Sequence, residues 1–145
     1  MNAPRAFFAT TRAVALLASS RTLRPRTRVR TARLLTQNLA NAWWPKSRNK
    51  KRIIAAHKRA AALFNNNFFK NARCLERAIA LCADLESAGE DPILRFGIKR
   101  DGSFEAHAWV ELDGVALLEN EAHLAQFEPF ERELAERWFS EARNR

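Results

Sequence analysis

The segment from residue 74 to residue 112 constrains the fold more than any other part of the chain. It begins with Cys74, which opens an apolar stripe at helical spacing that runs to Leu85. It ends in residues 104–112, where apolar and polar side chains alternate as they do in a half-buried strand. The sequence therefore predicts an α+β fold, in which a helix that carries a cysteine packs on a small antiparallel sheet.

Two strands form the hairpin in this segment. Residues 93–100 are expected to make the first strand, Asp101 and Gly102 the turn, and residues 104–112 the second strand. His107 lies on the second strand and points to its less apolar face, because side chains alternate along a strand. A cysteine at the start of a helix and a histidine on a strand can supply a nucleophile and its base.

The position of Cys74 favours its ionised form. Asn71 is expected to cap the helix, which places Cys74 about three residues into it. The free backbone N–H groups and the dipole at a helix N-terminus stabilise a thiolate. A single cysteine on an apolar face is more often a core residue, but His107 on the following strand favours the catalytic interpretation. Gly89 is expected to end the helix.

A third residue is needed to orient His107, and two candidates follow from the turn at Asp113 and Gly114. If this loop has three residues, His107 lies opposite Glu119; if it has two, His107 lies opposite Asn120. Glu119 is preferred, because a carboxylate also stabilises the charged imidazole, whereas an amide fixes only its tautomer. Asp113 is discounted, since the turn requires it and it faces away.

Charge divides the chain into two unlike parts. All 16 acidic residues follow residue 73, whereas residues 1–73 hold 17 of the 25 lysines and arginines. We therefore expect a basic helical N-terminal region at 1–62 and the core domain at 63–145. The helices expected before the core cover about residues 7–19, 29–42 and 53–64.

The role of the basic region stays open at this point. It is either a solvated extension that packs loosely on the domain or a docking surface for an acidic protein, a membrane surface or a nucleic acid. Trp43 and Trp44 are its large apolar anchors. An arginine-rich start without acidic residues also fits an organelle transit peptide. At the other end, residues 131–145 are expected to form an amphipathic helix that closes the core.

The cysteines and glycines further restrict the chemistry that the chain is expected to perform. Cys74 and Cys82 lie eight residues apart in one predicted helix, roughly 12 Å, which is too far for a disulfide. This favours a reducing compartment and a cytoplasmic protein. Neither a cluster with metal-ligand spacing nor a glycine-rich phosphate loop is present, so we expect no metal and no cofactor.

Three strings carry a resemblance to a known family: CLERAIAL at residues 74–81, LRFGI at 94–98, and AHAWVE at 106–111 followed by Asp113-Gly114. With these strings the chain resembles the bacterial leader peptidase of lasso-peptide biosynthesis, which is the transglutaminase-like half of the B protein and is often a separate chain. The resemblance covers about residues 60–125. It implies a transglutaminase/papain-like core.

The resemblance also implies residue roles and partners. The family's nucleophile matches Cys74 and its base matches His107, whereas the family usually has Asp where this chain has Glu119. The implied reaction is removal of the leader from a ribosomally made precursor peptide. A leader-recognition protein presents this substrate, and an ATP-dependent, asparagine-synthetase-like cyclase then closes the ring; no nucleic acid is expected.

Further residues complete the expected site. We expect contacts with the substrate or a partner from Trp43, Trp44, Trp109 and Glu111. The backbone N–H of Cys74 is the expected oxyanion donor, and Asn67 and Asn71 are candidates for a second one.

Two other classes of function remain open. A transglutaminase-like acyl-transfer enzyme would use the same cysteine and histidine with an amine acceptor. A non-enzymatic basic binding protein would instead act through residues 1–73, with Cys74 inert.

Overall fold

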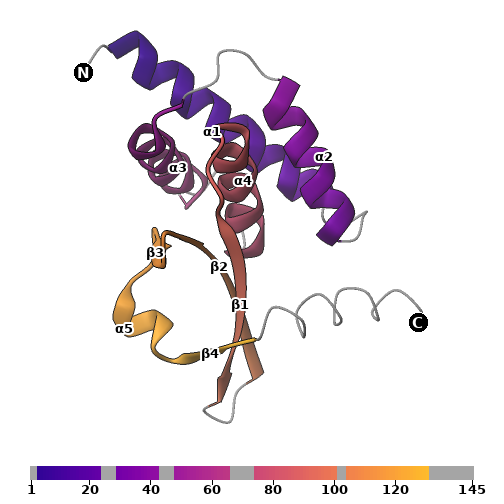
Figure 1. Cartoon of the computed structure of the whole chain (residues 1–145), viewed down its shortest axis with the longest axis vertical. Coiled ribbons are helices and arrows are strands. Elements are labelled where there is room, and N and C mark those ends of the chain that lie inside the picture. The colour runs from indigo at the N-terminus through magenta and orange to yellow at the C-terminus, as the bar shows by residue number, and fades with distance from the viewer. Residues whose placement is uncertain (1–2, 24–28, 43–47, 66–73, 101–103, 131–145) are drawn as a thin grey trace.

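The structure is a computed structural model of the 145 residues, and it describes residues 3–23, 29–42, 48–65, 74–100 and 104–130. The longer helices gather at one end of the molecule and a sheet extends away from them (Figure 1). The elements are α1 (Ala3–Leu23), α2 (Val29–Ala42), α3 (Lys50–Asn65), α4 (Cys74–Ser87), β1 (Ile93–Arg100), β2 (Phe104–Leu112), β3 (Val115–Leu117), α5 (Glu121–Leu124) and β4 (Phe127–Pro129).

The sheet has four antiparallel strands in the order β3-β2-β1-β4. β1 and β2 form the predicted hairpin, in which Gly97 pairs with His107. The segment from β3 through α5 to β4 arches from one edge of the sheet to the other (Figure 1). We call residues 118–126 the arch. The predicted α+β class, with the cysteine-bearing helix beside a small antiparallel sheet, is confirmed.

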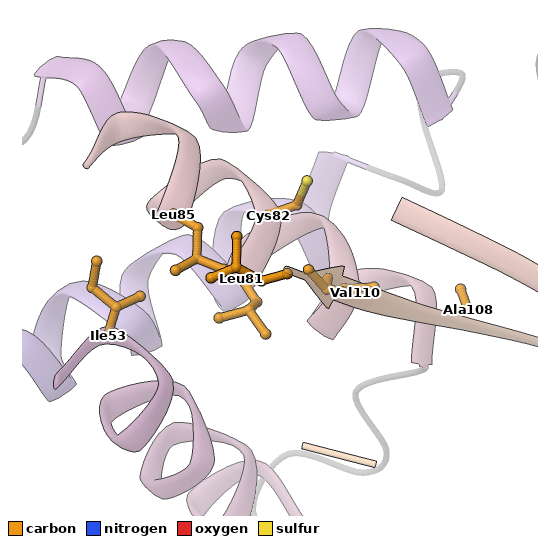
Figure 2. Close-up of a cluster of buried hydrophobic side chains, with 8 residues drawn as sticks. Ile53, Leu81, Cys82, Leu85, Ala108 and Val110 are labelled. Carbon is orange, nitrogen blue, oxygen red and sulfur yellow. The ribbon is translucent and has the colours of Figure 1, made fainter. Parts of the chain in front are cut away.

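The apolar stripe of α4 packs on one face of β2. Leu81, Cys82 and Leu85 share a buried cluster with Ala108 and Val110 (Figure 2). These two β2 side chains come from the strand face that the sequence predicts to be apolar. Each fully buried leucine contributes about 2 kcal/mol relative to an exposed one, so this contact holds the helix against the strand.

α4 ends in the way that its sequence predicts. Gly89 has a φ of 90°, in the left-handed region that glycine adopts without strain. The backbone N–H of Glu90 donates to the carbonyl of Leu85 at 3.1 Å, and that of Gly89 donates to Glu86 at 3.0 Å. These two hydrogen bonds form a Schellman motif, which turns the chain from the helix toward β1.

The N-terminal helices pack closely on the other side of α4. Leu16 and Leu17 of α1 and Ala40 of α2 form a second buried cluster with Ala80 and Ala83 of α4. α3 adds Ile53 to the cluster between α4 and β2. The expectation of a loosely packed, solvated extension is therefore wrong for the described parts of α1, α2 and α3.

A buried group of charges ties these helices together. The Arg12 guanidinium on α1 donates from Nε to Asp84 Oδ1 on α4 at 2.6 Å, and from Nη2 to the carbonyl of Ala40 on α2 at 2.7 Å. His57 Nε2 on α3 lies 3.1 Å from the other oxygen of Asp84. Arg12, His57 and Asp84 are each less than 5% exposed. A buried carboxylate is tolerated only when it is paired in this way.

The predicted elements agree with the structure to different degrees. The bounds predicted for α2, β1 and β2 are confirmed, α1 and α3 are longer than predicted, and α5 and β4 were not foreseen. Asn71, the tryptophan pair at 43 and 44, and the helix predicted at 131–145 lie outside the described residues. The domain division after residue 62 stays a prediction.

In the described parts of the chain, no helix is both long enough and apolar enough to span a membrane.

We predict that Arg12→Met lowers the free energy of unfolding by about 3 kcal/mol, because it leaves the Asp84 carboxylate buried without the Arg12 guanidinium. Urea denaturation of the full chain measures this change. Lys51→Met is the matched control, since Lys51 is exposed, and it should change stability by less than about 0.5 kcal/mol. A loss below about 1 kcal/mol for Arg12→Met would contradict the proposed importance of this cluster.

Candidate active site

Cys74 is the first residue of α4, and its side chain is partly exposed. The three residues before it lie outside the described part of the chain, so the expected helix start about three residues before the thiol stays a prediction. Packing of α4 on β2 brings this end of the helix to His107, and the two side chains form a hydrogen bond. The predicted nucleophile and its predicted base are thus in contact, although they lie on different elements.

Glu119 completes this arrangement. His107 Nε2 lies 3.1 Å from Glu119 Oε2, and the side chains are 9% and 16% exposed. Since Nε2 faces the carboxylate, the other ring nitrogen, Nδ1, is left for the thiol. The carboxylate can fix the tautomer and orientation of the imidazole and stabilise its charged form.

The reason for this contact differs from the one that the sequence suggested. Leu112 pairs with Val115, so the loop has two residues, and the three-residue loop that favoured Glu119 is wrong. Continued in this register, the strand would place Asn120 opposite His107. β3 ends instead at Leu117, and Leu118 takes a φ of 60°, so the chain leaves the sheet. This departure brings Glu119 to the imidazole.

Asn120 and Asp113 have other partners. Asn120 caps α5, and its Oδ1 accepts hydrogen bonds from the backbone N–H of Ala122 at 2.9 Å and of His123 at 3.3 Å. Asp113 lies in the turn with a φ of 53° and pairs with Lys50 at 2.7 Å. The discounting of Asp113 agrees with this position. The role of Asn120 as the alternative third residue stays a prediction, but the contact with His107 is made by Glu119.

The electrostatics of the pair favour an ionised thiol. Burial acts to raise the pKa of Cys74, but the hydrogen bond with His107, a backbone hydrogen bond at Ala108 and the charge of His107 together lower this pKa below its ordinary value. The hydrogen bonds to Cys74 and then to Glu119 raise the pKa of His107 to about 9, against the opposing effect of burial. Both shifts favour the form of the pair in which the thiol is ionised and the imidazole is protonated.

Aromatic side chains cover the imidazole. The ring centroid of His107 lies 5.1 Å from that of Phe127, 5.2 Å from that of His123 and 6.0 Å from that of Trp109. Gly97 makes room for this cover: a Cβ there would lie 3.0 Å from the Trp109 ring and 3.0 Å from the backbone oxygen of Glu128. On the strand face that the sequence marked as less apolar, His107 and Trp109 are thus buried, whereas Glu105 is exposed.

Trp109 and Glu111, which were expected to contact the substrate or a partner, form a pair. The Trp109 Nε1–H donates to Glu111 Oε1 at 3.1 Å, and Arg95 Nε donates to Glu111 Oε2 at 2.8 Å. Trp109 is 5% exposed and lines the pocket described next, whereas Glu111 does not. Their binding roles stay a prediction, and in the structure Glu111 orients the indole.

A pocket of about 410 Å³ opens beside Cys74. It lies between the start of α4, β2 and the segment 117–120, and side chains from α1 and α3 also line it. These helices contribute side chains that were not predicted from the sequence: Leu17, His57, Lys58 and Ala61. A signal was present: Ile53, His57 and Ala61 recur every four residues and so share one face of α3.

The other predicted site residues can be placed only in part. Trp43, Trp44, Asn67 and Asn71 lie outside the described residues, so the second oxyanion donor is unassigned. In the part of the chain that the structure describes, no group of three or more His, Cys, Asp or Glu side chains could hold a metal ion. Cys74 and Cys82 are both free thiols.

Comparison with known proteins agrees with this arrangement. The model of the transglutaminase-like superfamily matches residues 13–132. The chain therefore belongs to the transglutaminase-like superfamily, which includes cysteine peptidases and acyl-transferases. The matched region begins within α1 and includes α2 and α3. Neither a curated protein nor a solved structure matches the chain.

We predict that iodoacetamide alkylates Cys74 rapidly at pH values well below 8.5, because the lowered pKa keeps the thiolate populated there. His107→Ala removes the imidazolium and should slow the reaction at pH 6 by more than about tenfold. Mass spectrometry that reads each thiol separately measures both rates. Cys82 is the internal control, since burial raises its pKa to about 12. Equal pH profiles for the two thiols would contradict an assembled pair.

We predict that Glu119→Gln lowers the pKa of His107, because the amide cannot stabilise the imidazolium as the carboxylate does. An NMR titration of the His107 ring measures this pKa. Asn120→Ala is the matched comparison: it should cost about 1 kcal/mol of stability through the lost cap of α5 and leave the pKa of His107 in place. A larger effect from Asn120→Ala would assign the third position to the amide.

Proposed function

We propose that this chain is a cysteine peptidase that removes the leader from a ribosomally made precursor peptide during lasso-peptide maturation. The observation that carries the proposal is the contact of Cys74 with His107 and of His107 with Glu119 at the edge of an open pocket. Membership of the transglutaminase-like superfamily supports cysteine-based acyl chemistry. The lasso-peptide role is supported by the strings CLERAIAL and AHAWVE at their observed separation.

The chemistry follows from the ionised pair. The Cys74 thiolate attacks the carbonyl carbon of the bond between leader and core, and the carbonyl oxygen becomes an oxyanion. The backbone N–H of Cys74 in α4 is the donor that we assign to this oxyanion. One such donor contributes roughly 3 kcal/mol to the stability of the transition state.

The proton on His107 then completes the first half of the reaction. It passes to the amine nitrogen, the C–N bond breaks, and the core leaves with a free α-amine, while the leader remains on Cys74 as a thioester. His107, now neutral, takes a proton from water as the water attacks the thioester. The leader leaves with a carboxylate, and the thiolate and imidazolium are restored. Glu119 keeps the imidazole oriented throughout.

The proposal includes partners. A leader-recognition protein presents the precursor, and an asparagine-synthetase-like cyclase uses the released core. The basic residues of the N-terminal region suit the docking of an acidic peptide or protein, with Trp43 and Trp44 as anchors.

In a titration of the recognition protein, replacement of both tryptophans by alanine should weaken binding, and an unchanged affinity would remove this docking role. A reducing cytoplasm suits a catalytic thiolate.

Transglutaminase-like acyl transfer is the second candidate, because the superfamily includes both activities and both pass through the same thioester. The two differ only in the acceptor. Hydrolysis releases the leader as an acid, whereas transfer attaches it to an amine.

We predict that the full chain, mixed with leader–core peptides and a leader-recognition protein, releases the leader as a free acid. Cys74→Ala should reduce the rate by at least about a thousandfold, because the nucleophile is lost. Cys82→Ala is the matched control, since this second thiol lies in the core and not in the pocket. Mass spectrometry of the products measures cleavage.

The products also decide between the two candidates. An added primary amine that appears covalently on the leader, in place of the acid, would favour acyl transfer. An equal rate for Cys74→Ala and the unchanged chain would contradict both.

A further inference from the structure

Two cations line the pocket beside Cys74. Lys58 comes from α3 and Arg77 from α4. Arg77 follows Cys74 by three residues, so the two side chains lie one turn apart on the same side of the helix. Lys58 is exposed and Arg77 is partly exposed. Among the described residues, neither side chain makes a hydrogen bond or an ion pair.

The carboxylates around the pocket are already paired. Glu119 contacts His107 at 3.1 Å, and Asp84 contacts both Arg12 and His57 in the buried cluster behind the pocket. Glu119 is the one carboxylate among the described residues that line the pocket, and it contacts His107. The pocket presents two uncompensated positive charges next to the thiol.

The rest of the pocket lining suits the aliphatic part of a side chain of a bound ligand. Apolar side chains make up most of it, and they come from several elements: Leu17, Ala61, Ala78, Leu81, Val110 and Leu117. A ligand with a short aliphatic stem and a negative end would bury the stem against these groups and place its charge between the two cations. The guanidinium of Arg77 can bind a carboxylate through two parallel N–H groups, while Lys58 adds a point charge.

From this geometry we propose that Lys58 and Arg77 form a carboxylate-binding subsite, so that the substrate carries an acidic side chain close to the bond that Cys74 attacks. The inference rests on the proposed function and adds a specificity to it. A glutamate or aspartate there gains the attraction of both cations, and a lysine or arginine at the same place is repelled. Arg77 carries more of the discrimination, because the exposed Lys58 is screened by solvent.

The test compares two alkylating agents that differ in charge. Iodoacetate carries a carboxylate next to its reacting carbon, and iodoacetamide is its neutral counterpart. Both react with Cys74 in the full chain, and the quantity measured is the ratio of their rate constants at pH 7 and low salt. Because both agents meet the same thiolate, the ratio reports the attraction of the site for the carboxylate and not the reactivity of the sulfur.

The expected result is that Lys58→Gln combined with Arg77→Gln lowers the iodoacetate-to-iodoacetamide ratio by about three- to tenfold. The matched control combines Lys51→Gln with Arg52→Gln, which removes the same charge from α3 at positions outside the pocket lining. It should change the ratio by less than about twofold. Added salt should reduce the difference between the two double variants.

Two outcomes would overturn the subsite. The ratio could be the same in the unchanged chain and in the pocket variant, or it could fall equally in both double variants, which would reveal only an effect of net charge. Both outcomes leave the proposed function untouched as long as Cys74 reacts as a thiolate at low pH. Loss of that thiolate behaviour in the unchanged chain would instead contradict the proposed function.

Discussion

The packing of α4 against β2 is the contact on which the candidate site depends. Cys74 and His107 are 33 residues apart in the sequence and lie on different elements, so only this packing brings them together. α4 carries both the apolar stripe that contacts β2 and the Cys74 thiol, which this contact places beside His107. The N-terminus of α4 is therefore fixed in place by Leu81 and Leu85, deeper in the core.

The N-terminal helices support α4 from its other side and also shape the pocket. Arg12, His57 and Asp84 link three helices through one buried carboxylate, and such a cluster favours one arrangement of these helices because any other leaves a charge unpaired. α3 then supplies Lys58 to the pocket next to the thiol. The described helices of the basic half, α1, α2 and α3, are thus part of the structure that holds α4 and lines the pocket.

The sequence predicted those parts of the structure that depend on local pattern. The stripe of α4, its end at Gly89 and the β1–β2 hairpin follow from spacing and turn chemistry, whereas the pairing of Cys74 with His107 was inferred from their residue types and elements. The third residue was harder to predict, because the register argument assumed a straight β3, whereas the positive φ of Leu118 takes the chain out of the sheet. The inward faces of α1 and α3 were missed because their many positive charges conceal a short repeat of small buried side chains.

We infer that Cys74 and His107 form an ion pair at neutral pH, and the chemistry proposed for the site depends on it. The ultraviolet absorbance of the thiolate tests it most directly, recorded against pH for a Cys82→Ala chain, with a chain that lacks both cysteines as the blank. Because the pKa of Cys74 is lowered, we expect thiolate absorbance to be already present at pH 7 and to disappear only at a pH well below the ordinary thiol value of about 8.5. Absorbance that first appears with a midpoint at or above that value would contradict the ion pair.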